Sequence, residues 1–78
     1  MVQLYTKPKC PNCKQTKRVF KISNIDFIEI NVMEDESAFN LVKEELGFTS
    51  LPVISADGFE AFEYNKDKVM NFVKQYNS

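Results

Sequence analysis

Hydrophobic and polar residues in the first part of the chain change period twice, which predicts a strand, a helix and a second strand. Residues 2–6 (VQLYT) alternate apolar and polar side chains, as a half-buried strand does. Pro11 suits the first position of a helix, and residues 12–22 continue with helical spacing and a basic outer face. Residues 23–25 end that helix, and residues 26–32 (DFIEINV) alternate again. The apolar or small stripe of the helix consists of Cys13, Thr16, Val19 and Phe20.

Two later segments also have the helical period. Residues 34–48 open with acidic side chains, which favour the N-terminal end of the helix dipole, and Gly47 is a C-terminal stop signal. Residues 65–76 form the other helix, with Asn65 as its cap. The predicted inward faces are Phe39, Val42 and Leu46 in the first of these helices, and Val69, Phe72, Val73 and Tyr76 in the second.

A β-hairpin is predicted between these helices. Residues 52–55 and 59–64 have strand composition, and Asp57-Gly58 between them is a strong turn signal. The order is therefore β-α-β-α-β-β-α, an α/β fold in one domain of residues 1–78. The first two strands should be parallel with a right-handed crossover, and the hairpin adds antiparallel strands.

Composition and charge restrict the class of protein. The chain has 78 residues, 44% of them hydrophobic, which suffices for one small core. Its net charge of −1 gives no long-range attraction to nucleic acid or membrane surfaces. The sequence contains no apolar run long enough to span a bilayer, and its N-terminus (MVQLYTK) lacks the apolar core of a secretory signal. We therefore expect a cytoplasmic protein, and we expect it to be monomeric.

Both cysteines of the chain lie in the stretch KCPNC, residues 9–13. They could be half of a metal site, a structural disulfide or a reactive dithiol. Two cysteines are too few for a disulfide framework, and a stable bridge is unusual in a reducing compartment. Zinc sites generally need four ligands, and the chain has no histidine. A metal shared between two chains remains an alternative, but the Cys-x-x-Cys spacing favours the dithiol.

The position of the pair assigns each cysteine a role. Cys10 lies between a predicted strand and a predicted helix, so helix N–H groups should stabilise its thiolate and lower the pKa of its thiol. Five nearby cations act in the same direction. Cys13, one turn further along, should be more buried. We expect Cys10 to attack a disulfide and Cys13 to resolve the mixed disulfide. The nearby cations are Lys7, Lys9, Lys14, Lys17 and Arg18.

Pro52 follows TSL and opens a predicted strand. Proline is tolerated at such an end, and most X–Pro bonds are trans, so sequence alone predicts a trans bond here.

Three stretches together resemble the glutaredoxin-like branch of the thioredoxin superfamily. They are YTKPKCPNCKQTKRVF (5–20), FIEINV (27–32) and GFTSLPVI (47–54), and they cover most of the chain. Within that branch the chain is similar to the small NrdH-type redoxins, electron donors of ribonucleotide reductase, while Cys-Pro-x-Cys is typical of ordinary dithiol glutaredoxins. The resemblance implies a thioredoxin fold, with a four-stranded mixed sheet and three helices.

The same resemblance implies a set of site residues. Cys10 is the nucleophile and Cys13 the resolving thiol. Pro52 is cis and packs against the dithiol, and Leu51 offers its backbone to an extended substrate. Lys7 matches a basic position that helps to hold the glutathione carboxylate. The predicted substrate-binding residues are Lys7, Pro11, Asn12, Ser50, Leu51, Pro52 and Tyr64.

One region departs from the glutathione-using pattern. Phe62 and Glu63 replace a glycine pair against which the glutathione backbone lies, and Glu63 would repel a carboxylate. We therefore expect reduction by thioredoxin reductase, with ribonucleotide reductase as the client protein. The alternative is a dithiol glutaredoxin reduced by glutathione. A third possibility is a metal or iron–sulfur module. We expect no metal, and no cofactor beyond the redox-active cysteine pair.

Overall fold

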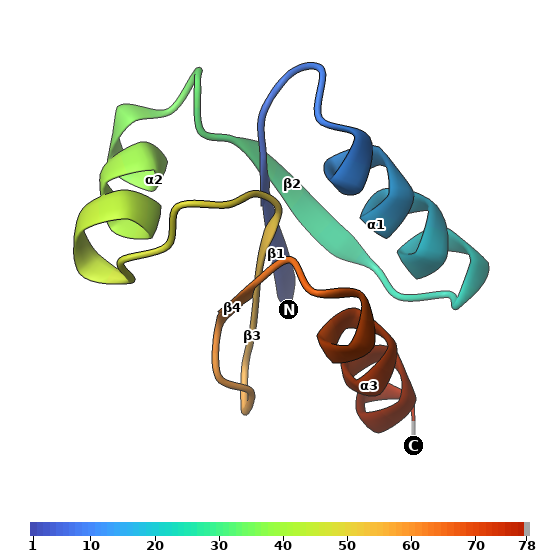
Figure 1. The fold of residues 1–78 in the computed structure, drawn as a ribbon. Helices are drawn as coiled ribbons and strands as arrows, with labels where there is room; N and C mark the ends of the chain where they lie inside the picture. Colours follow the sequence, from blue (N-terminus) through green and yellow to red (C-terminus); the bar gives the residue numbers. More distant parts are fainter. Residues whose placement is uncertain (78) are drawn as a thin grey trace.

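The computed structural model describes residues 1–77, and its elements follow the predicted order (Figure 1). A short π-helical segment, η1, directly continues the second helix. The bounds are β1 (Val2–Thr6), α1 (Pro11–Ile22), β2 (Phe27–Asn31), α2 (Glu36–Asn40), η1 (Leu41–Glu45), β3 (Val53–Ala56), β4 (Phe62–Glu63) and α3 (Lys66–Tyr76).

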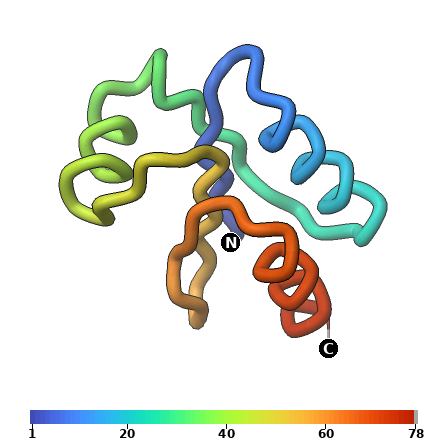
Figure 2. Tube along the Cα trace, viewed as in Figure 1, coloured from blue at the N-terminus to red at the C-terminus, as the bar shows by residue number. Residues whose placement is uncertain are grey.

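The four strands form one mixed sheet in the order β2-β1-β3-β4. β1 pairs in parallel with β2, with Val2 opposite Phe27, and antiparallel with β3, with Val2 opposite Ala56. β3 and β4 are antiparallel. The tube in Figure 2 shows β1 in the middle of the molecule, crossing between its neighbours. The predicted thioredoxin fold is therefore confirmed.

Helices cover both faces of the sheet, and each face has its own apolar cluster. α1 and α3 lie on one side of the sheet and α2 with η1 on the other (Figure 1). The buried residues on the α1 and α3 side are Val2, Leu4, Phe20, Ile25, Ile54, Ala56, Val69 and Phe72. Those on the α2 side are Tyr5, Val32, Ala38, Val42 and Val53. Within residues 1–77, no helix is both long and apolar enough to cross a membrane.

The first and last helices begin as predicted. Pro11 is the first residue of α1, and Asn65 caps α3, its side-chain oxygen accepting a hydrogen bond from the Lys68 amide at 3.1 Å. Phe72 of α3 is 4% exposed. Its ring lies within 6 Å of four other aromatic rings, which makes it the centre of the larger cluster. These rings belong to Phe20, Phe59, Phe62 and Tyr76.

The second helix differs from the prediction in length and in its buried face. It begins at Glu36, where the Asp35 side chain accepts a hydrogen bond from the Ala38 amide at 3.0 Å. Ala38 and Val42 are its buried residues, whereas Phe39 is 38% exposed and the predicted inward position of Phe39 is wrong. The wider π-helical turn, closed by Leu46 N–H donating to the Leu41 carbonyl at 2.9 Å, changes the period of the second half.

The hairpin is also shorter than predicted, because β4 holds only Phe62 and Glu63. The Asp57-Gly58 turn is present: the Phe59 amide donates to the Ala56 carbonyl at 3.1 Å, and Gly58 has a φ of 83°. Phe59 then leaves the ladder. Its ring packs against Phe72 at 5.0 Å between centroids, so burial of the ring replaces strand pairing.

Candidate active site

The two cysteines lie where β1 gives way to α1, and they form a disulfide. Their Cα atoms are 5.2 Å apart, a normal separation for a bridge. Cys13 is 2% exposed and Cys10 is half-buried, as the predicted division of roles requires. An incoming sulfur can therefore reach Cys10 more readily than Cys13.

The start of α1 is built to stabilise negative charge on Cys10. Cys10 is the N-cap residue of the helix, and the Cys13 backbone amide donates to its Sγ at 3.1 Å. Pro11, at the first helical position, has no N–H that would need a partner. In the reduced protein the same amide and the same helix end would face a thiolate, which is the reactive form of cysteine.

A second segment, distant in sequence, meets the dithiol from the side of β3. The Leu51–Pro52 peptide bond is cis, as the family resemblance implied and against the trans bond expected from sequence alone. Pro52 is fully buried, and the carbonyl oxygen of Leu51 lies 3.8 Å from Cys10 Sγ. The structure thus brings Leu51 and Cys10 together, although 41 residues separate them.

The dithiol lies in a hollow of about 610 Å³, and a separate, smaller hollow of about 440 Å³ is lined by residues 59–63 and by α3. Four lysines line this larger hollow together with both cysteines, so most of the predicted cations do surround the site. These lysines are Lys7, Lys9, Lys14 and Lys17. Among residues 1–77, no group of three or more His, Cys, Asp or Glu side chains is arranged to hold a metal ion.

Glu29 of β2 lines the same hollow, and its presence there was not predicted. Its Oε2 accepts from Thr6 Oγ1 at 2.8 Å and from Lys17 Nζ at 3.0 Å. The hydrogen bond from Lys17 and then that from Thr6 lower the pKa of the Glu29 carboxyl below its usual value. The sequence does predict that Glu29 belongs to a strand parallel to β1. It does not give the register of the two strands, which is what places Glu29 near Thr6.

The remaining predicted site residues fall into two separate hollows. Asn12 and Tyr64 share one of about 460 Å³ with Pro11, between α1 and α3. Ser50 and Leu51 line another of about 280 Å³, on the α2 side. Lys7 lines both that hollow and the one with the dithiol. Tyr64 therefore does not share a hollow with Ser50 and Leu51, and of these two groups only Pro11 and Leu51 are placed next to Cys10.

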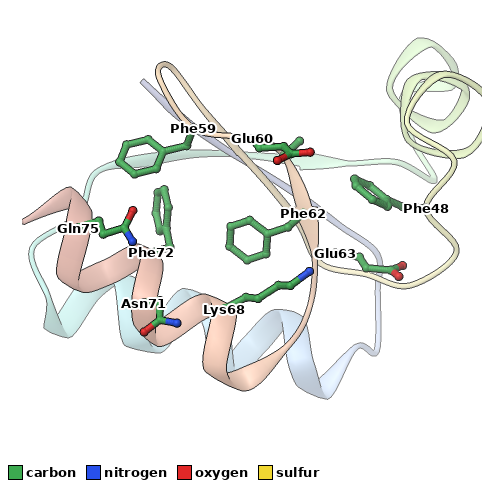
Figure 3. A pocket seen from close by; sticks show the side chains of 10 residues that line it. Phe48, Phe59, Glu60, Phe62, Glu63, Lys68, Asn71, Phe72 and Gln75 are labelled. Carbon is green, nitrogen blue, oxygen red and sulfur yellow. The ribbon is translucent and has the colours of Figure 1, made fainter.

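Glu63 has a structural role that sequence reasoning missed. Its Oε2 accepts hydrogen bonds from the backbone amides of Thr49 at 3.3 Å and Ser50 at 3.1 Å. In Figure 3 its side chain reaches toward the segment that leads into β3, away from the rings of Phe59 and Phe72. The Glu63 carboxylate therefore binds the segment that includes Leu51, whose carbonyl lies next to Cys10.

Comparisons with known proteins agree with this geometry. The glutaredoxin family model matches residues 2–60. A glutaredoxin-like 8.6 kDa protein of the rubredoxin operon of Clostridium pasteurianum is 32% identical, covering 96% of this chain and all of its own. The glutaredoxin-like protein NrdH of Lactococcus lactis is 39% identical, covering 76% of this chain and 81% of its own. The solved NrdH-redoxin of Escherichia coli, described as having a thioredoxin-like activity profile, has a TM-score of 0.80 at 28% identity and covers 90% of this chain and 91% of its own.

Proposed function

The chain belongs to the glutaredoxin family, and we propose that it carries electrons to the disulfides of partner proteins through Cys10 and Cys13. Glutaredoxins and NrdH-type redoxins are thiol–disulfide oxidoreductases, and the chain has their Cys-x-x-Cys site. The observation that carries the proposal is the asymmetry of the pair. Cys10 is accessible at a helix N-terminus, and Cys13 is buried one turn behind it.

The reaction is two successive thiol–disulfide exchanges. The Cys10 thiolate attacks one sulfur of the client disulfide, so that a Cys10–client bond forms while the client's own S–S bond breaks and its other sulfur leaves as a thiolate. The Cys13 thiolate then attacks Cys10 Sγ and releases the second client sulfur. Two electrons pass to the client, which takes up two protons, and the Cys10–Cys13 disulfide remains.

The backbone next to Cys10 supplies a place for the client chain. Leu51 lies beside the attacking sulfur, and we propose that an extended client segment pairs with its backbone, as a short additional strand would. Lys7 borders both the dithiol hollow and the one beside Ser50 and Leu51. Its side chain would therefore border the client segment on this side of the dithiol. Pro11, Asn12 and Tyr64 would contact the other side of the client.

We propose ribonucleotide reductase as the client, thioredoxin reductase as the electron donor and the cytoplasm as the compartment. Two observations support this choice. The structural neighbour from Escherichia coli is an NrdH-redoxin with a thioredoxin-like activity profile. In addition, the Glu63 carboxylate is bound by the amide of Ser50, the residue before Leu51, and there it would repel the negative charges of glutathione. The protein then needs no cofactor beyond its own cysteine pair.

The second candidate is a dithiol glutaredoxin that glutathione reduces. Lys7 at the edge of the dithiol hollow and the Cys-Pro-Asn-Cys sequence favour it. A coupled assay separates the two donors. NADPH oxidation is followed with a protein disulfide as substrate, once with thioredoxin reductase and once with glutathione and glutathione reductase. We expect turnover with thioredoxin reductase to be at least tenfold faster. Equal or faster turnover with glutathione would overturn the proposed donor.

The roles of the two cysteines have their own test. Cys10→Ser should abolish the reduction of a protein disulfide. Cys13→Ser should stop after the first exchange and accumulate a covalent complex with the client, visible on a non-reducing gel and cleared by dithiothreitol. Full turnover of Cys13→Ser with a protein disulfide would show that Cys13 is not the resolving thiol.

A further inference from the structure

Two adjacent backbone amides next to the dithiol bind a carboxylate of the chain itself. The N–H groups of Thr49 and Ser50 both donate to one oxygen of Glu63, at 3.3 and 3.1 Å. Consecutive amides that converge on one oxygen form an anion-binding pair, and hydrogen bonds to an ionised acceptor are stronger than neutral ones. Ser50 directly precedes Leu51, whose carbonyl lies beside Cys10.

The short fourth strand places Glu63 at this pair. In the β3–β4 ladder Glu63 lies opposite Val53, and Val53 is the residue that follows Pro52. Neighbouring residues of a strand point to opposite faces. Phe62 accordingly packs against Phe72, at 5.9 Å between ring centroids, and Glu63 extends toward the segment of Thr49 and Ser50 (Figure 3).

An incoming carboxylate therefore meets an occupied site. It would have to displace Glu63 from both amides, and the displaced charge would stay close by and repel it. Without Glu63, the two amides would have no anion. Lys68, which lines the hollow of about 440 Å³ together with Glu63, would add a positive charge nearby. Whether the Thr49 and Ser50 amides attract an incoming carboxylate thus depends on the side chain of Glu63.

We propose that Glu63 is a specificity-determining residue. It fills a carboxylate site formed by the Thr49 and Ser50 amides and so excludes small disulfides with free carboxylates, in favour of disulfides within a polypeptide. The inference rests on the proposed disulfide reduction. It identifies the substrate class as disulfides without a carboxylate near the reacting sulfurs.

A matched pair of substrates tests the discrimination. Pre-reduced protein is mixed with oxidised glutathione or with its tetraethyl ester, which lacks the four carboxylates, and the second-order rate constants of oxidation are compared. In each reaction the two protein thiols become the Cys10–Cys13 disulfide, and the small disulfide becomes two thiols. We expect the wild type to favour the ester, and Glu63→Ala to shift the rate ratio toward the carboxylate form by about tenfold. Glu63→Gln should lie between, because it can still accept from the amides but carries no charge.

Glu60→Ala is the control for net charge. Glu60 is exposed and lines the same hollow as Glu63, but its side chain lies apart from that of Glu63 (Figure 3), which is the acceptor of the Thr49 and Ser50 amides. Its substitution changes the net charge equally and should leave the rate ratio within about twofold of the wild type. A ratio for Glu63→Ala equal to that of Glu60→Ala would refute the proposal.

A binding measurement makes the result independent of catalysis. Acetate is titrated into ¹⁵N-labelled oxidised protein, and the amide resonances of Thr49 and Ser50 are followed. They should shift in a saturable manner in Glu63→Ala and remain in place in the wild type. No shift in folded Glu63→Ala overturns the carboxylate site. If no form of the protein reduces any disulfide, the proposed function fails, and the acetate titration still decides whether the site exists.

Discussion

The hydrogen bond between Thr6 and Glu29, at the wall of the dithiol hollow, makes a sharp prediction. Thr6 is 2% exposed, and its Oγ1 donates to the Glu29 carboxylate at 2.8 Å. Thr6→Val keeps the shape of the side chain and replaces the hydroxyl with a methyl group, so it removes one donor from a charged acceptor and changes little else.

The expected cost is about 1 kcal/mol at neutral pH. A hydrogen bond to a charged group contributes roughly 1.5–3 kcal/mol when it is buried, but the Glu29 side chain is 41% exposed, so water replaces much of the lost donor. The Lys17 and Thr6 hydrogen bonds lower the pKa of Glu29 in the folded protein. The two hydrogen bonds therefore contribute their full stabilisation of the folded state above pH 4.5, the ordinary pKa of a glutamate. This contribution is lost as the pH falls through the lower pKa of Glu29 in the folded protein.

Urea unfolding at pH 7 and pH 3, followed by circular dichroism of the oxidised protein, measures this effect. With a slope of roughly 1 kcal/mol per M for so small a domain, Thr6→Val should lower the midpoint by about 1 M at pH 7 and by clearly less at pH 3. Thr16→Val is the matched control. Thr16 is 1% exposed and donates at 2.8 Å to the Asn12 carbonyl, which does not titrate, so its cost should be the same at both pH values.

A cost of Thr6→Val that does not change with pH would refute the reasoning, because it would mean that the ionised Glu29 carboxylate is not the acceptor that stabilises Thr6. A cost of Thr16→Val with the same dependence on pH would refute it equally, since the difference would then come from the fold as a whole.

Three further predictions concern the core, a helix cap and the nucleophile. Phe72→Ala should lower the free energy of unfolding by about 3–5 kcal/mol in urea titrations, whereas Phe39→Ala, at an exposed position, should cost less than about 1 kcal/mol; similar costs would contradict the described core. Asn65→Ala should cost about 1 kcal/mol and Asn65→Gly only a few tenths in the same titrations, and equal losses would exclude side-chain capping. The Cys10 thiol of the reduced protein should have a pKa below the free-cysteine value of about 8.5, measured from thiolate absorbance near 240 nm in the Cys13→Ser variant, where Cys10 is the single thiol; a midpoint at or above that value would show that the helix end does not stabilise the thiolate.

The parts of the fold and site that could be predicted depend on local sequence. Pro11 and Asn65 mark helix starts through their own backbone and side-chain chemistry, and the spacing of Cys10 and Cys13 sets their separation and their unequal burial. Phe39 was misplaced because Ala38, one position earlier, shares the buried face with Val42, and the large apolar side chain of Phe39 is the stronger signal in the local pattern.

The missed contacts join residues that are far apart in sequence. Glu29 meets Thr6 over 23 positions, and Glu63 meets Ser50 over 13. Each pairing depends on strand register, which the sheet as a whole determines. The cis bond before Pro52 was expected only from the family resemblance, since local preference favours trans.

The central position of β1 also has a consequence for slow local opening. β1 is paired on both sides, whereas β2 and β4 are edge strands. Amide protons of Leu4 and Tyr5 should therefore exchange with deuterium only on global unfolding, and those of the two-residue β4 much earlier. On this expectation Cys10 follows the strand whose amides exchange slowest, and Glu63 belongs to a strand whose amides exchange early. The half of the site that reacts is thus held by the most persistent part of the fold, and the half that selects substrates can open separately.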